Sequence, residues 1–128
     1  MKIKIRNVIK NYQGNSIPFK DSPEDKERDM IVRDALNNVL NGTEIDQQGR
    51  AKPETKEAKG RIYQLSTKLW SVKKEIKLST EEGAFIKKRA SLVANITPLI
   101  YGRICDIIEG KNEEKNKDNT GKATKAKA

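Results

Sequence analysis

The chain has 128 residues, of which 34% are hydrophobic and 35% are charged, and its formal net charge is +9. This length suggests one domain with a small core, and no apolar run approaches the ~20 residues that cross a bilayer. The basic N-terminal segment has no apolar centre typical of a secretory signal, and a lone Cys105 leaves no intrachain disulfide, so we expect a cytoplasmic protein.

Residues 1–20 carry a net charge of +5 and are predicted to form a short strand or hairpin. Ile3 and Ile5 alternate with basic residues, which is the period of a half-buried strand. A Gly-Asn turn signal precedes residues 16–19, which resemble a second, edge strand because they contain Pro18. A two-stranded hairpin is marginal alone, so we expect it to pack on helices.

Residues 21–46 carry a net charge of −5, and within them a helix is predicted over residues 23–41. Ser22-Pro23 is a typical helix start, but the apolar stripe begins only near Met30. The pattern therefore fits a helix with a solvated first half, or an acidic loop before a shorter helix; we favour the former, with a start in 23–29. Two glycines and Pro53 then predict a loop over 42–53.

The next helix is predicted over residues 54–76, and residues 47–77 carry a net charge of +6. Apolar residues recur at intervals of three and four, the strongest amphipathic pattern in the chain: Ala58, Ile62, Leu65, Leu69, Val72 and Ile76. Trp70 and Tyr63 flank this stripe. The end of the segment, residues 75–78, also fits a short strand.

Residues 78–110 are electrically neutral and predict two helices, over 80–95 and 98–109. Ser79 and Glu82 have the spacing of a capping box, Thr97-Pro98 marks a second start, and Gly110 fits a left-handed cap. Residues 111–128 lack aromatic and branched aliphatic side chains, which predicts a disordered lysine-rich tail. Together the elements predict a mainly α (α+β) fold: one globular domain over residues 1–110, with a strand or hairpin before about four helices.

No combination of residues supports catalysis. The chain has no histidine, the usual acid-base group at neutral pH. Cys105 has no nearby base, and we expect a structural core role for it. The E-x-K sequences at Glu54 and Glu57 lack the strand and aspartate of a nuclease, and the acidic run lacks a calcium-loop pattern. We therefore expect no enzyme, no catalytic residues, no metal site and no cofactor.

Two kinds of macromolecular contact are consistent with the sequence. The last helix is apolar on most sides, so it is buried centrally or covers a partner; its candidate protein-contact residues are Leu99, Ile100, Ile104, Ile107 and Ile108. The basic residues near the third and fourth predicted elements are the candidate nucleic-acid contacts, with Trp70 as a stacking surface: Lys68, Trp70, Lys73, Lys74, Lys87, Lys88 and Arg89. Against the second reading, Trp70 adjoins the apolar stripe, which favours a core-edge residue over a stacking surface.

Four segments, in order, resemble small accessory proteins of tailed bacteriophages and prophages: residues 33–41 (RDALNNVLN), 78–82 (LSTEE), 86–88 (IKK) and 98–110 (PLIYGRICDIIEG). The resemblance covers about half of the chain and implies a viral protein that works in the host cytoplasm. It carries no catalytic residues to transfer. We therefore expect a non-enzymatic accessory protein that binds a protein partner, such as an assembly chaperone, adaptor or host-factor modulator. Nucleic-acid binding without sequence specificity is the alternative, and self-association remains open.

Overall fold

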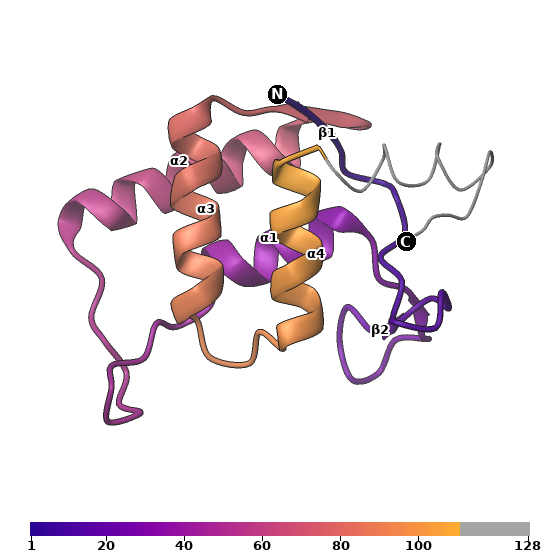
Figure 1. Ribbon diagram of the computed structural model, residues 1–128, viewed down its shortest axis with the longest axis horizontal. Helices are drawn as coiled ribbons and strands as arrows, with labels where there is room; N and C mark the ends of the chain where they lie inside the picture. Colours follow the sequence, from indigo (N-terminus) through magenta and orange to yellow (C-terminus); the bar gives the residue numbers. More distant parts are fainter. Residues whose placement is uncertain (111–128) are drawn as a thin grey trace, which may run out of the picture.

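The computed structural model describes residues 1–110, and the tail predicted over residues 111–128 lies outside this range. Eight elements follow in chain order: β1 (Lys2–Lys4), β2 (Pro18–Phe19), β3 (Arg28–Asp29), α1 (Val32–Asn41), α2 (Lys56–Ser71), β4 (Glu75–Lys77), α3 (Thr80–Leu92) and α4 (Pro98–Ile108). Four helices with short strands confirm the predicted mainly α (α+β) class (Figure 1).

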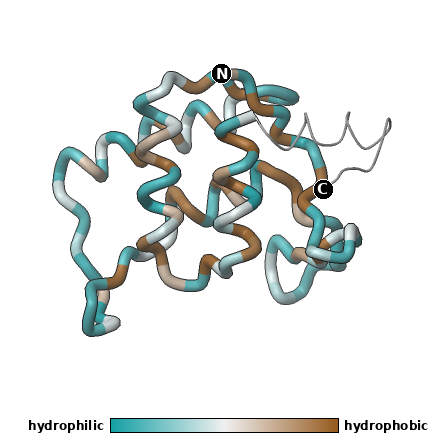
Figure 2. The backbone as a smooth tube through the Cα atoms, in the orientation of Figure 1, coloured by the Kyte–Doolittle hydropathy of each residue, from teal (hydrophilic) through white to brown (hydrophobic). Residues whose placement is uncertain are grey.

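Helix α1 is the centre of the core. It packs against α2, α3 and α4, and Figure 1 shows it passing behind the adjacent α3 and α4. Ala35, Leu36, Val39 and Leu40 are each at most 2% exposed, because they form the i, i+1, i+4, i+5 stripe of one helix face. Figure 2 shows the contrast with the two long loops flanking the helices, which are mostly hydrophilic.

The first half of the helix predicted over residues 23–41 was wrong, and α1 begins only at Val32. Residues 23–31 instead contain a turn and strand β3. Residues 23–27 offer no apolar side chain to bury, so a helix there would gain little from packing. The helix starts where Asp34 accepts a hydrogen bond from the Ile31 N–H at 2.9 Å, which satisfies a free backbone donor in its first turn.

The predicted N-terminal strand is confirmed as β1, but the hairpin alternative, in which it would pair with residues 16–19, was wrong. Strand β1 pairs antiparallel with β4, with Ile3 opposite Ile76, and β2 pairs with β3. Both isoleucines point into the core, while Lys2 and Lys77 lie opposite each other on the exposed face. The pairing of β1 with β4 buries both isoleucines against the helices. This burial stabilises the fold more than a solvent-exposed local hairpin would.

Helix α2 is shorter than the predicted 54–76. Thr55 accepts a hydrogen bond from the Ala58 N–H and is the N-cap, and the chain leaves the helix at Val72 to enter β4. The alternative strand reading of residues 75–78 is thus close to the structure. The backbone has to extend after Val72 because Ile76 is needed beside Ile3.

The starts of α3 and α4 follow the sequence signals closely. Ser79 and Glu82 form the predicted capping box, and Thr97 caps α4 with Pro98 at its first position. The predicted ends, residues 95 and 109, lie three and one residues beyond the observed ones. Asn95 adopts a left-handed backbone (φ 72°) in the connection, and Gly110 (φ 78°) follows α4 as expected of a left-handed cap.

Candidate functional site

The predicted cationic residues do not form one surface. Lys68 forms an ion pair with Glu82 at 3.1 Å, and Lys87 pairs with Glu109 at 2.7 Å. The hydrogen bond to Glu109 raises the pKa of Lys87. Although burial raises the pKa of Glu82, hydrogen bonds from the Ser79 N–H and from Lys68 bring it below its usual value. These two lysines therefore have acidic partners within the protein.

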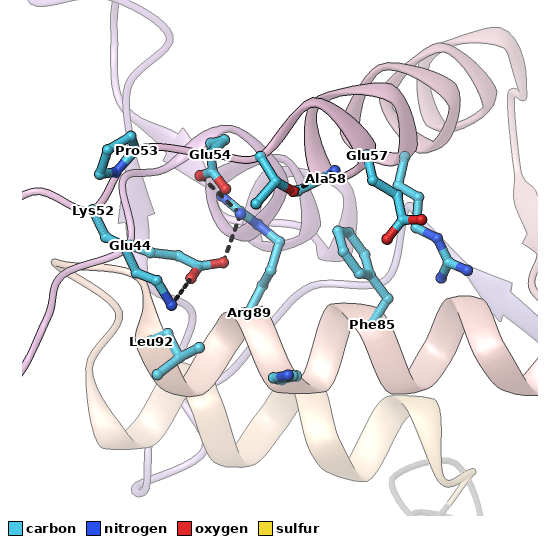
Figure 3. A pocket seen from close by; sticks show the side chains of 12 residues that line it. Glu44, Lys52, Pro53, Glu54, Glu57, Ala58, Phe85, Arg89 and Leu92 are labelled. Atoms are coloured by element: carbon cyan, nitrogen blue, oxygen red, sulfur yellow. Dashed lines mark hydrogen bonds and ion pairs between the residues drawn. The ribbon is translucent and has the colours of Figure 1, made fainter.

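Arg89 is not a nucleic-acid contact, because it is buried. Its side chain is 2% exposed, and its guanidinium lies between the carboxylates of Glu44 and Glu54 at 2.8 and 2.9 Å (Figure 3). The same group donates to the backbone oxygens of Val39 and Gly42. One cation thus joins α3 to the end of α1 and to the loop before α2.

A pocket of about 350 Å³ lies beside Arg89 and is lined by charges of both signs. Lys52, Arg61 and Lys88 line it together with Glu44, Glu54 and Glu57, and Phe85 and Leu92 add apolar surface. Figure 3 shows Glu44, Glu54 and Lys52 near Arg89. The Arg61 guanidinium lies 5.6 Å from the Phe85 ring centroid. Arg89 itself is fully engaged with its protein partners, so it connects segments and is not available to a ligand.

A different group of cations lies on segments that meet near Trp70. We define the basic–aromatic patch as Arg6, Arg33, Trp70, Lys73 and Lys74. Trp70 is 55% exposed; its Nε1–H donates to Asn37 Oδ1 at 3.1 Å, and the Arg33 guanidinium lies 4.7 Å from its ring centroid.

Backbone contacts bring the remaining members of the patch together. Arg6 Nε donates to the Lys73 carbonyl at 3.1 Å, and the Ile5 N–H donates to the Lys74 carbonyl. The Arg33 N–H in turn donates to the Ile5 carbonyl. The patch therefore joins the end of β1, the first turn of α1 and the segment after α2.

Acidic residues border the patch, and two of them, Asp21 and Asp34, bind Arg28. Its guanidinium binds both carboxylate oxygens of Asp21 and both of Asp34, at 2.8 to 3.0 Å. The hydrogen bond from Arg28 lowers the pKa of Asp21, and the two carboxylates raise that of Arg28. Arg6, Arg33 and Trp70 share a pocket of about 410 Å³ with this cluster.

The predicted protein-contact residues of α4 are divided between core and surface. Ile104 and Ile108 are buried in the core, which uses one side of the helix. Leu99, Ile100 and Ile107 are half-buried, and two of them, Ile100 and Ile107, pack against the core. The largest exposed apolar side chain of α4 is Tyr101, at 38%.

Cys105 is half-buried rather than part of the core, contrary to the prediction. The neighbouring Cys105 side chain, one turn along the helix, raises the pKa of Tyr101. Within residues 1–110, no three histidine, cysteine, aspartate or glutamate side chains come together in a way that would hold a metal ion. No helix in that range has both the length and the apolar character of a membrane span.

Sequence reasoning missed the patch residues Arg6 and Arg33, and misplaced Arg89. Arg6 and Arg33 carry no local signal, because only tertiary contacts bring them near Trp70: Arg33 through the packing of α1 against α2, and Arg6 through its bond to the segment after α2. For Arg89 the signal was present: it falls at the i+3 position of the apolar series Ile86, Ala90 and Val93, and so on the buried face of α3.

Comparisons with protein-family models, curated proteins and solved structures found no match to the chain.

Proposed function

We propose that this protein is a non-enzymatic nucleic-acid-binding protein that contacts phosphates through the basic–aromatic patch, largely without sequence specificity. The observation that carries the proposal is the meeting of the segments that bear Arg6, Arg33, Lys73 and Lys74 near the exposed Trp70. Such a combination of positive charge and an aromatic surface is typical of proteins that follow a nucleic-acid backbone.

The pairing of charges supports this choice of surface. Lys68, Lys87 and Arg89 have acidic partners. Within residues 1–110, Arg6, Arg33, Lys73 and Lys74 form no ion pair with an acidic side chain: Arg6 binds a carbonyl and Arg33 lies against an indole ring. Lys73 and Lys74 are exposed. Arg6, Lys73 and Lys74 are therefore available for phosphates, while Arg33 holds the indole ring, and phosphate binding would release condensed counterions.

The proposal is tested by charge reversal at the patch. In Lys73→Glu/Lys74→Glu we expect at least a tenfold loss of affinity for a labelled oligonucleotide at ~50 mM salt, and the wild type should itself lose at least tenfold at ~200 mM. The matched control is Lys56→Glu/Lys59→Glu, which changes net charge equally but lies near the other end of α2, ~16–21 Å along the axis from Trp70. Equal losses in both double variants, or no salt dependence, would contradict the proposal.

Binding of a protein partner through α4 is the second candidate function. It is favoured by the partial exposure of Leu99 and Ile107 and by Tyr101, which together leave apolar surface on a helix whose other side fills the core. Aromatic and aliphatic side chains of this kind supply much of the binding energy in protein interfaces. This reading agrees with the resemblance to phage accessory proteins, for which a location in the host cytoplasm is part of the proposal.

Salt separates the two candidates. Burial of apolar surface on α4 is nearly insensitive to moderate salt, since its driving force is not Coulombic. Tyr101→Ala should then weaken capture of the protein partner without affecting oligonucleotide affinity. Capture of a partner that survives ~200 mM salt and nuclease treatment, together with no oligonucleotide binding at ~50 mM, would replace the first proposal by the second.

A further inference from the structure

We infer that Trp70 is a stacking site for one unpaired base, so that the protein binds single-stranded nucleic acid in preference to duplex. This inference rests on the proposed function and specifies its ligand. The first observation is that the indole is held in place while exposed. Asn37 accepts its Nε1–H, and Asn41 donates to the same Asn37 oxygen at 3.1 Å. Arg33 lies against the ring, so little side-chain freedom remains to be lost on binding.

The pocket beside Trp70 has the chemistry of a base site and not of a phosphate site. Its lining includes three arginines and three aspartates, which balance in charge: Arg6, Arg28, Arg33, Asp21, Asp29 and Asp34. A neutral pocket of about 410 Å³ with both donors and acceptors suits a flat, uncharged ring with polar edges. A phosphate there would meet as many negative as positive groups.

Positive charge also extends from Arg6, which lines this pocket, along the strand pair, where Glu75 opposite Lys4 is the one acidic residue. Lys2, Lys4 and Arg6 alternate with the buried Ile3 and Ile5, and so share one exposed face. Lys77 lies directly opposite Lys2 across the strands. A cross-strand pair of like charges is destabilising in the free protein, and a phosphate between the strands would relieve the repulsion.

Arg6 links the two regions, because it both lines the pocket and donates to the Lys73 carbonyl. A nucleic-acid strand can therefore place a base against Trp70 while its neighbouring phosphates follow Arg6, Lys73 and Lys74. A duplex cannot do this without extruding a base, which costs a few kcal/mol in lost stacking and pairing. In a single strand the base faces are already accessible, and stacking on an aromatic side chain is favourable for every base.

The chain contains one tryptophan, so intrinsic fluorescence reports on this site alone. Wild-type protein is titrated at low salt with an oligothymidylate, with the corresponding duplex, and with an abasic oligonucleotide of equal length. We expect the oligothymidylate to quench the fluorescence and to bind about tenfold or more tightly than the abasic strand, because stacking of one base stabilises a complex by about 1–3 kcal/mol. The duplex should bind more weakly than the oligothymidylate and should not quench.

Variants test the same point by fluorescence polarisation of a labelled strand. Trp70→Ala should weaken oligothymidylate binding about tenfold, and Trp70→Phe should restore most of it, because the ring face is kept. Tyr63→Ala, which removes a 73% exposed aromatic ring elsewhere on α2, is the matched control and should have no effect.

The outcomes distinguish this inference from the proposal on which it rests. Equal affinity for abasic and thymidine strands, with no quenching, would overturn base stacking and leave phosphate binding intact. Tighter binding of duplex than of single strand would also overturn the inference. Failure of all three nucleic acids to bind at ~50 mM salt would instead overturn the proposed function, and the inference with it.

Discussion

Arg89 shows how one residue can determine the course of a loop. A buried cation is costly unless its hydrogen-bonding groups are satisfied, and here two carboxylates and two carbonyls surround the guanidinium. Glu44 and Glu54 lie near the two ends of the loop between α1 and α2. A planar donor with five N–H groups can bind several acceptors at once, which the ammonium group of lysine cannot match in geometry.

We therefore predict that Arg89→Met lowers the free energy of unfolding by about 3–5 kcal/mol, because it leaves two carboxylates without their buried partner. Urea denaturation followed by circular dichroism measures the change. The neighbouring Lys88→Met is the control, since Lys88 is exposed on the same helix and should change stability by less than ~0.5 kcal/mol. Similar losses in the two variants would mean that the buried network contributes little.

Single residues were the hardest features to predict from the sequence. Lys87, Lys88 and Arg89 are consecutive and chemically alike, yet successive helical residues point ~100° apart, so they cannot share one environment. Lys87 pairs with Glu109, Lys88 faces solvent, and Arg89 is buried. Treating the run as one basic surface ignored this rotation. Trp70 shows the opposite case, since its place beside the apolar stripe favoured the core, whereas the ring lies largely exposed.

At the scale of elements, two glycines have opposite roles. Gly42 ends α1 where there is no space for a side chain: a β-carbon there would lie 2.6 Å from the Asn38 carbonyl oxygen and in closer contact with Val93 Cγ1. Gly60 lies inside α2, exposed, with open space around it. The first glycine is required by packing, and the second weakens its helix.

We predict that Gly42→Ala lowers the free energy of unfolding by about 1–3 kcal/mol, as expected for overpacking. Gly60→Ala should raise it by about 0.5–1 kcal/mol through helix propensity. Thermal unfolding of the two variants provides an internal control, because the chemical change is identical. A stabilising Gly42→Ala would show that the contact between α1 and the segment after α3 is looser than described.

Element starts were predicted well where the signal is local. A capping box and a Thr-Pro pair act within three residues, so the starts of α3 and α4 could be read directly from the sequence. Strand pairing was not predictable in this way. Pro18 and Phe19 pair with residues 28 and 29, and β1 pairs with β4, because burial in the whole core determines the partner. The charged residues 24–27 were wrongly predicted to be helical for a related reason: helix propensity without an apolar face does not make a helix.

At the scale of the whole molecule, Ile5 connects three distant segments. Its side chain is fully buried, its N–H donates to the Lys74 carbonyl, and its carbonyl accepts from the Arg33 N–H, both at 3.0 Å. The same contacts position the basic–aromatic patch. The patch could not be predicted from the sequence, because its members come from three segments that only the folded core brings together.

Ile5→Ala should therefore lower the free energy of unfolding by about 2–5 kcal/mol. Because these contacts link both halves of the described chain, unfolding should remain a single transition in which Trp70 fluorescence and circular dichroism coincide. Val8→Ala, at a 38% exposed position nearby, should have little effect. Separate transitions for the two signals would show that the strand pair and the helices unfold independently.

The pairing of β1 with β4 also has a consequence during protein synthesis. Ile3 and Ile76 are 73 positions apart, so at translation rates of about 5–20 residues per second the first strand waits roughly 4–15 s for its partner. During that interval its isoleucines have no core to enter. Lysine and arginine at alternate positions give the nascent segment a repulsive charge, which discourages association with other unfinished chains on the polysome. The basic residues of β1 thus protect the segment before they contribute to any surface of the finished protein.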